Sequence, residues 1–554
     1  MAGWAALLPR WSDFAAMRRQ PVRDLLAGVT VGLVALPLAL GFGISSGLGA
    51  GAGIITAIVA GVLAAVFGGS NLQISGPTGA MTVVLVPIVA ELGADGVLVV
   101  GLMSGVLLIG LAYAGAGRFM SYLPLPVIEG FTIGIAVVIA LQQVPAALGI
   151  RMRSGTVLGA TGQAIADWIE QPVLTPVLIC VAVAGSMLLA ARVRPAFPVS
   201  LVAVLAATLV VALADLDVQL VGAIPAGLPA PALPQVPWSH LSALLLPAVA
   251  VAALAALESL LSATVADGMT VDERHDSNRE LFGQGIANLG SPLFGGIPAT
   301  AAIARTAVNA RAGARTRLAA ITHSLVLLLV VLVASRWVSE IPLAALAGVL
   351  VATAIQMVEV SSMLVLLRAT RADGIVLVLT AVATVALDLV TAVLLGLVVA
   401  GAFALHQTAR TARLDPLPLG RHDHQVAPEP LLDEHIVVFR LDGPLFFAAA
   451  HRFLLELTAI GEVRVVVLRM SRVTSLDATG ARVLADAIRR LEQRGTRVLL
   501  SNIRPEHTAV LSRLGVYDEL AHERHVFTST PAAIAHARVH AARQPHRPGL
   551  PASG

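Results

Sequence analysis

The chain has 554 residues, of which 57% are hydrophobic and only 13% charged. Soluble domains carry about 25% charged residues, so the composition excludes an ordinary water-soluble protein. The formal net charge is +3, and the arginines are spread along predicted loops, so no nucleic-acid partner is expected. The single cysteine, Cys180, excludes an intrachain disulfide. We predict a multi-pass protein whose main partner is the lipid bilayer.

Residues 1–23 form a predicted cytoplasmic segment. Their apolar stretches are too interrupted for a cleavable signal peptide, and the aromatic residues among them are typical of a membrane interface. Membrane insertion would then depend on the first spanning helix.

Residues 24–408 form the predicted transmembrane domain, because their apolar stretches approach the ~20 residues that cross a bilayer as a helix. Most loop arginines fall on one side when the N-terminus is placed in the cytoplasm, and the long opposite loop at 215–241 has none. An inner-membrane protein with both termini cytoplasmic is therefore expected. Fourteen elements are predicted, at 24–47, 50–68, 77–91, 97–116, 124–149, 172–192, 198–214, 242–267, 280–293, 299–310, 317–336, 342–358, 373–388 and 390–408.

Two short segments interrupt the apolar pattern. "ISGPTGAM" at 74–81 and "GIPATAAI" at 296–303 each place Gly, Pro and Thr before a short apolar helix, and they lie 221 residues apart when Pro77 is aligned with Pro298. Two halves of seven elements each have opposite orientations, because seven is odd. Paired interrupted segments in matching halves indicate a binding site near the middle of the membrane. The alternative is chance similarity between segments rich in Gly, Ala and Pro.

Arg305 follows the second of these segments. A helix that begins after Pro298 points its N-terminal amides into the membrane interior, and such an end attracts anions. The helix that begins near Thr78 would supply a second end facing the first. Arg305, about two turns inside, would add a full positive charge. A charge inside the membrane is a functional candidate; the alternatives are snorkelling at a helix end and a salt bridge to Glu258.

Glu258 is the only carboxylate deep in its apolar element, and Ser262 lies four residues later on the same helical face. Removal from water favours the neutral acid, which makes Glu258 a candidate proton carrier. The alternatives are a sodium site formed with Ser262, and a structural hydrogen bond or ion pair.

Beyond the transmembrane domain, residues 409–433 form a predicted linker, 434–540 a small α/β domain and 541–554 a disordered tail. The apolar stretches "HIVVFRL", "VRVVVLRM" and "TRVLLSNI" are typical of buried strands, and "ATGARVLADAIRRLEQRG" of a helix that ends at Gly495. Asp477 and Thr479 stand between a strand and this helix. The favoured interpretation is that the hydroxyl at this helix N-terminus, that of Thr479, caps the helix, and a phosphorylation or docking site is the alternative.

Motifs of enzymes and metal sites are missing from the sequence. We find no P-loop, no Gly-x-Ser-x-Gly and no Cys/His cluster at the spacing of metal ligands. We therefore expect neither an enzyme nor a resident metal or cofactor.

Several long motifs resemble the sulfate permease family, the bacterial relatives of the solute carrier 26 anion transporters. They are "AGVTVGLVALPLALGFGISSG", "ISGPTGAMTVV", "HDSNRELFGQGIANLGSPLFGGIPATAAIARTAVNARAGARTRLA" and the later "LDGPLFFAAA" and "VTSLDATG". The resemblance covers about residues 20–535. It implies fourteen transmembrane segments in two seven-segment inverted repeats, with core and gate domains, and a cytosolic STAS domain. Members are typically homodimers that move anions by an elevator-like mechanism.

The resemblance also implies a site between the facing ends of segments 3 and 10. Glu258 falls at an acidic position that is an aspartate, followed four residues later by threonine, in a sodium-coupled bicarbonate relative. Glu258 and Ser262 depart from that pair, which weakens the sodium interpretation. Leu38 replaces a polar residue of some relatives and makes the pocket more apolar. The implied substrate-binding residues are Phe42, Thr78, Gly79, Thr300, Ala304 and Arg305.

We therefore expect a secondary active transporter for an inorganic or small organic anion: a C4-dicarboxylate, sulfate or bicarbonate. Proton symport by an elevator-like mechanism is the favoured interpretation. A sodium-coupled bicarbonate symporter and an uncoupled exchanger or channel are the alternatives. The expected partners are the small anion, a second copy of the chain and a cytosolic protein that binds the STAS domain.

Overall fold

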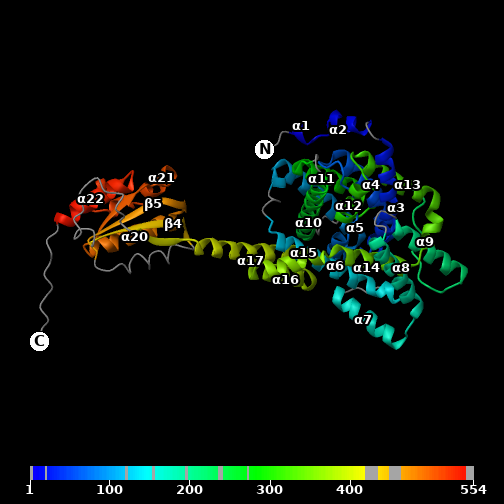
Figure 1. The fold of residues 1–554 in the computed structure, drawn as a ribbon. Helices are drawn as coiled ribbons and strands as arrows, with labels where there is room; N and C mark the ends of the chain where they lie inside the picture. The colour runs from blue at the N-terminus through cyan, green and yellow to red at the C-terminus, as the bar shows by residue number, and fades with distance from the viewer. Residues whose placement is uncertain are drawn as a thin grey trace. The chain divides into compact units, whose positions relative to one another are not determined.

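The computed structural model describes residues 4–18, 21–118, 123–151, 156–193, 198–234, 241–270, 274–387, 389–417, 435–447 and 463–543. The chain divides into two compact units, residues 1–400 and 401–554, and each is described by itself. The first unit is helical and the second contains a sheet (Figure 1).

Among the described residues, nine helical stretches are long and apolar enough to span a membrane. This agrees with the predicted multi-pass fold. The helices up to the end of the apolar region are α1 (Trp4–Leu7), α2 (Trp11–Ala15), α3 (Pro21–Ser45), α4 (Ala50–Phe67), α5 (Gly79–Tyr113), α6 (Leu125–Ala147), α7 (Val157–Glu170), α8 (Leu174–Val193), α9 (Val199–Leu213), α10 (Leu241–Gly268), α11 (Ser277–Leu293), α12 (Ile303–Arg311), α13 (Leu318–Ser339), α14 (Leu343–Met357), α15 (Val360–Ala369), α16 (Arg371–Ala386) and α17 (Leu389–Arg410).

Several boundaries differ from the predicted elements. The elements expected at 77–91 and 97–116 lie in one helical stretch, α5, which is broken at Gly93. Gly93 has a φ of 69°, which glycine adopts without the steric cost that a side chain brings. The helices α7 and α15 were not predicted, because each is amphipathic and short of a full apolar span.

Small residues allow the helices of this unit to pack closely. A side chain at Gly53 of α4 would collide with the carbonyl oxygen of Ala39 in α3, and one at Gly283 of α11 would collide with the backbone of Gly68 at the end of α4. The Gly- and Ala-rich sequence of these helices therefore determines how near their backbones can lie.

Two short strands pair where the interrupted segments meet. Strand β1 (Ser75–Gly76) pairs with β2 (Thr300–Ala301) in antiparallel fashion, with Ser75 opposite Ala301. Each strand leads into a helix, β1 into α5 and β2 into α12. The strands begin 225 residues apart, four more than the prolines that we aligned. The structure thus brings the two related segments together, in a slightly different register.

The second unit contains a five-stranded sheet in the order β3-β4-β5-β6-β7, in which β3 is antiparallel to β4 and the other pairs are parallel. Strand β3 falls within the stretch predicted as a linker, so that stretch is not structureless where it is described. Of the tail, residues 541–543 belong to α22 and the rest lies outside the described residues. The elements are β3 (Arg413–Leu417), β4 (Ile436–Leu445), β5 (Val465–Leu476), α20 (Ala478–Gln493), β6 (Arg497–Ser501), α21 (Pro505–Arg513), η5 (Tyr517–Glu519), η6 (Glu523–His525), β7 (Val526–Phe527) and α22 (Thr530–Arg543).

Candidate functional site

The paired strands β1 and β2 place two helix N-termini beside each other. Thr78 caps α5, and its hydroxyl accepts a hydrogen bond from the Met81 amide. The capping residue of α12 is Ala302, which has no side-chain acceptor. Backbone amides in the first turn of a helix lack intrahelical acceptors and carry partial positive charge. The two ends together therefore favour a negatively charged ligand.

Arg305 lies in the first turn of α12 and is 1% exposed. Its Nη2 donates a hydrogen bond to the Pro77 carbonyl oxygen at 2.6 Å, whereas its Nη1 has no hydrogen-bond partner among the described residues. We expected Arg305 about two turns inside the helix. That expectation was wrong, because strand β2 delays the start of α12 to Ile303. The guanidinium therefore lies closer to the helix end than the sequence indicated.

Glu258 approaches the same point from α10, which packs against α5, α12 and β2. The Thr78 hydroxyl donates a hydrogen bond to Glu258 Oε2 at 2.9 Å. Glu258 is partly exposed, unlike Arg305. Among the described ion pairs none joins these two side chains within 4 Å. The carboxylate and the guanidinium are thus both linked to the Pro77–Thr78 segment without neutralising each other directly.

The remaining predicted residues lie at differing distances from this centre. Phe42 packs beside Gly79, where an added Cβ would be 3.1 Å from the aromatic ring. Ala304 is exposed next to Arg305, and the Thr300 hydroxyl lies 3.0 Å from that of Ser259. Ser262 donates instead to the Thr306 hydroxyl at 3.1 Å. Glu258 and Ser262 therefore bond to different neighbours, although they share a helical face.

A polar face of α11 forms hydrogen bonds to β1 and to the residue before β2. We did not single this face out from the sequence. The Asn288 side chain donates to the Ala299 carbonyl and accepts from the Ala299 amide, both at 2.8 Å. Gln284 donates to the Ser75 hydroxyl at 2.6 Å and to Glu280 at 2.9 Å. The signal was available in the sequence, because Glu280, Gln284 and Asn288 recur every four residues and so share one helical face.

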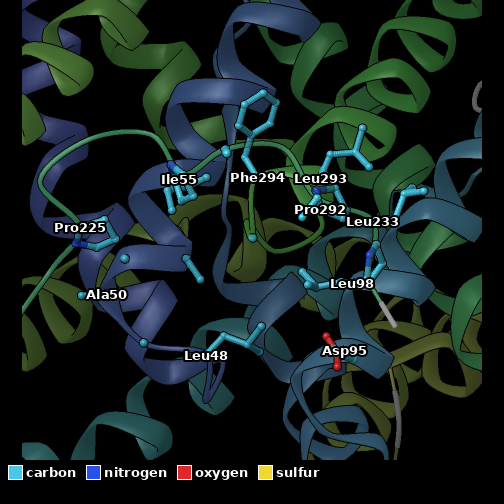
Figure 2. Close-up of a pocket in the computed structure, with 18 of the residues that line it drawn as sticks. Leu48, Ala50, Ile55, Asp95, Leu98, Pro225, Leu233, Pro292, Leu293 and Phe294 are labelled. Carbon is cyan, nitrogen blue, oxygen red and sulfur yellow. The ribbon is translucent and has the colours of Figure 1, made fainter. Parts of the chain in front are cut away.

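A cavity of about 630 Å³ lies elsewhere in the first unit. It is lined by the turn between α3 and α4, the first part of α4, part of α5, the loop at 221–234 and the end of α11 (Figure 2). Asp95 is its one charged lining residue, and none of the predicted substrate-binding residues is among those that line it. A lining that holds a carboxylate and no basic side chain does not favour an anion.

In the second unit, α20 is capped by Asp477 and not by the hydroxyl of Thr479, which we had favoured as the cap. Its carboxylate accepts hydrogen bonds from the Gly480 amide at 2.7 Å and from the Phe447 amide at 3.1 Å. Thr479 is exposed in the first turn of the helix. The docking alternative therefore depends on Thr479 more than on Asp477.

Interrupted helices that meet inside a multi-pass bundle define the molecule as a membrane transporter. Comparisons with known proteins identify the transporter family. A profile described as "Sulfate permease family" matches residues 22–380, and one described as "STAS domain" matches residues 428–533. The chain belongs to the sulfate permease family.

Relatives of the chain are similar over most of their length. "Putative sulfate transporter YvdB" of Bacillus subtilis (strain 168) is 34% identical over 91% of this chain and 96% of its own length. "Bicarbonate transporter BicA" of Synechocystis sp. is 32% identical over 89% of this chain and 90% of its own.

Solved structures agree with this assignment. The transmembrane domain of a cyanobacterial BicA matches with a TM-score of 0.61 at 34% identity, over 69% of this chain and 97% of that one. Murine Slc26a9 in the inward-facing state matches with a TM-score of 0.82 at 20% identity, over 97% and 94%. The expected family, the membrane fold with its STAS domain and the exclusion of an enzyme are thereby confirmed. The chain is an anion transporter of this family.

Proposed function

We propose that the chain is a secondary active transporter that carries a small anion, bound at Arg305, across the inner membrane together with a proton. The buried Arg305 guanidinium supports this most directly, because its Nη1 has no partner among the described residues. A buried donor without an acceptor costs about 1–3 kcal/mol, and more when it is charged. An anion that accepts this hydrogen bond removes that cost, and the two helix ends add to the attraction.

Glu258 is the proposed proton carrier. Its carboxylate accepts from Thr78, the cap of the helix that faces Arg305. An ionised Glu258 repels a bound anion, and protonation of Glu258 removes this repulsion. Anion and proton then bind more tightly together than separately, and this linkage is reciprocal. Such mutual dependence is what a symporter requires.

The proposed substrates are sulfate, bicarbonate and C4-dicarboxylates. All three present oxygens that accept hydrogen bonds from a guanidinium and from helix N-terminal amides. The relatives named for sulfate and for bicarbonate transport support the first two. Thr78, Gly79, Thr300 and Ala304 would surround the anion, and Phe42 would form an apolar wall.

Uptake into proteoliposomes tests the proposal. We expect saturable uptake of at least one of labelled sulfate, bicarbonate and succinate, driven by a proton gradient without sodium, with unlabelled substrate competing. Uptake that needs sodium would instead support a sodium site at Glu258 and the neighbouring hydroxyls of Ser259 and Ser262. Ohmic, unsaturable anion current would contradict a carrier and support a channel.

The remaining parts of the proposal concern assembly. An elevator-like movement of the site, a homodimer, and cytoplasmic placement of both termini follow from the family resemblance. The STAS domain would then lie in the cytosol, where a protein partner can reach the exposed Thr479.

A further inference from the structure

Three histidines of the second unit form a compact cluster. His525 ends η6, and His536 and His540 lie on α22. One potential ligand atom from each lies within 4.8 Å of those of the others. The Nε2 atoms of His536 and His540 are 3.1 Å apart, and the ring centroid of His525 is 5.7 Å and 5.1 Å from those of His536 and His540.

The local fold explains why the rings meet. His536 and His540 are four residues apart and therefore neighbours on one helical face. The adjoining face of α22 is anchored by Ala533, Ala537 and Ala541, which pack in an apolar cluster with β4, β5 and β6. Strand β7 pairs with β6 and follows η6 directly. The sheet thus holds His525 against the half-buried side of α22 that carries His536 and His540.

His525 is buried without full hydrogen bonding. His525 is only 3% exposed, and its Nδ1 has no hydrogen-bond partner among the described residues. Imidazole ligates metals in its neutral form, through a ring nitrogen that carries no proton. A buried nitrogen lone pair or N–H without a partner needs an explanation.

We propose that His525, His536 and His540 bind a divalent transition-metal ion of the zinc type. Imidazole nitrogens suit such ions. Zn–N distances of 2.0–2.1 Å in a tetrahedral site place ligand nitrogens about 3.4 Å apart, close to the 3.1 Å between His536 and His540. The third nitrogen lies within 4.8 Å of the other two, and metal binding requires the rings to move it to the same spacing. Three protein ligands leave a fourth position for water or for a partner's side chain.

This proposal revises our expectation that the chain binds no metal. The spacing His-x-x-x-His at 536–540 is visible in the sequence, but the third ligand comes from an element whose position only the fold defines. A metal would join η6 to α22 and so hold the last helix against the sheet. The competing explanation is metal-free packing of three rings, with a hydrogen bond between His536 and His540.

Cobalt binding to the purified full-length chain, without a polyhistidine tag and in detergent, decides between them. Co²⁺ in a tetrahedral nitrogen site gives intense visible absorption bands. We expect these bands to saturate at one Co²⁺ per chain and to disappear when Zn²⁺ displaces the cobalt. His536→Ala should weaken binding at least about 100-fold, because loss of even an outer-shell partner costs 10- to 100-fold.

A second variant distinguishes ligation from a folding defect. His536→Cys should retain tetrahedral cobalt and add a thiolate-to-cobalt charge-transfer band, which arises only if position 536 is a ligand. His406→Ala, exposed on α17, and the double variant H422A/H424A should retain the original bands. The proposal is overturned if a folded chain shows no tetrahedral bands, or if His536→Ala binds Co²⁺ like the unaltered chain.

Discussion

Two arginines of this chain differ in burial and in how many of their hydrogen-bond donors are used. Arg305 in α12 is almost fully buried, donates to one carbonyl oxygen and has an Nη1 without a partner among the described residues. Arg489 in α20 is half exposed, and its three nitrogens donate to Glu519 and Asp486. Every side-chain nitrogen of Arg489 donates a hydrogen bond, whereas Arg305 Nη1 has no acceptor among the described residues.

The surroundings determine what each arrangement contributes. An exposed ion pair gains little, because water and salt screen it and two long side chains must be ordered. A buried charge interacts far more strongly with any partner that reaches it. We therefore expect substitution of Arg305 to remove transport, and substitution of Arg489 to change only local stability.

The largest expected effect is that of Arg305→Ala. Its loss removes the full positive charge and the hydrogen-bond donor between the two helix ends, so we expect uptake to fall at least about 100-fold, as the loss of a buried charge partner worth 3–5 kcal/mol implies. Initial uptake rates in proteoliposomes, at matched protein insertion, measure this. Arg305→Lys is the matched control: it keeps the charge but not the planar fork, and should retain part of the activity. Undiminished uptake by Arg305→Ala would refute the assigned site.

Glu258→Gln should remove the coupling of transport to protons without abolishing anion binding. The amide keeps the size of the side chain and can still accept from Thr78, but it cannot release or take up a proton. We expect uptake to lose its dependence on the proton gradient, while exchange of labelled for unlabelled anion continues. Parallel measurement of gradient-driven uptake and exchange separates these outcomes. A variant that still responds to the gradient would remove Glu258 as the proton carrier.

Sequence reasoning singled out Arg305, Thr78 and Glu258 as candidates, because charges and interrupted helices are conspicuous in apolar surroundings, and the structure brings these residues together. It could not place the start of α12, since the pairing of β1 with β2 joins residues 224 and 226 positions apart. The histidine cluster escaped for the same reason: His525 reaches α22 through the sheet. Patterns within one element were predictable, and contacts between elements were not.

Gly76→Ala tests whether the position of the guanidinium matters as much as its charge. An added Cβ at Gly76 would lie 2.6 Å from Arg305 Nη1, too close for an unshifted side chain. We expect roughly tenfold weaker apparent anion affinity, since displacement costing about 1.4 kcal/mol has that effect. The concentration dependence of uptake measures it. Gly110→Ala, where the added atom meets nothing within 4 Å, is the control and should leave affinity unchanged; equal effects of both would argue against a positioning role.

Asp477→Ala should act on the second unit alone. It removes the cap of α20 and the acceptor of the Phe447 amide, and loss of a cap costs about 1 kcal/mol. Hydrogen exchange of the α20 amides in the full chain should accelerate accordingly, with uptake unchanged. Thr479→Ala, at the exposed neighbouring position, should leave exchange unaltered. If Thr479→Ala instead abolished binding of a cytosolic protein, the docking interpretation of this turn would be supported.

The smallest effect should come from the exposed ion pair between Arg489 and Glu519. Hydrogen bonds from Arg489 lower the pKa of the Glu519 carboxyl. A lowered pKa means that the ionised form stabilises the fold above the pKa of the unfolded chain, and that this contribution is lost as the pH falls through the folded value. Hydrogen exchange near η5 should therefore differ slightly between the unaltered chain and Glu519→Gln at pH 7 and low salt, and converge in acid or at high salt. If Glu519→Gln changed hydrogen exchange as much as Asp477→Ala does, exposure to solvent would not weaken this ion pair. The contrast with Arg305 would then need a cause other than burial.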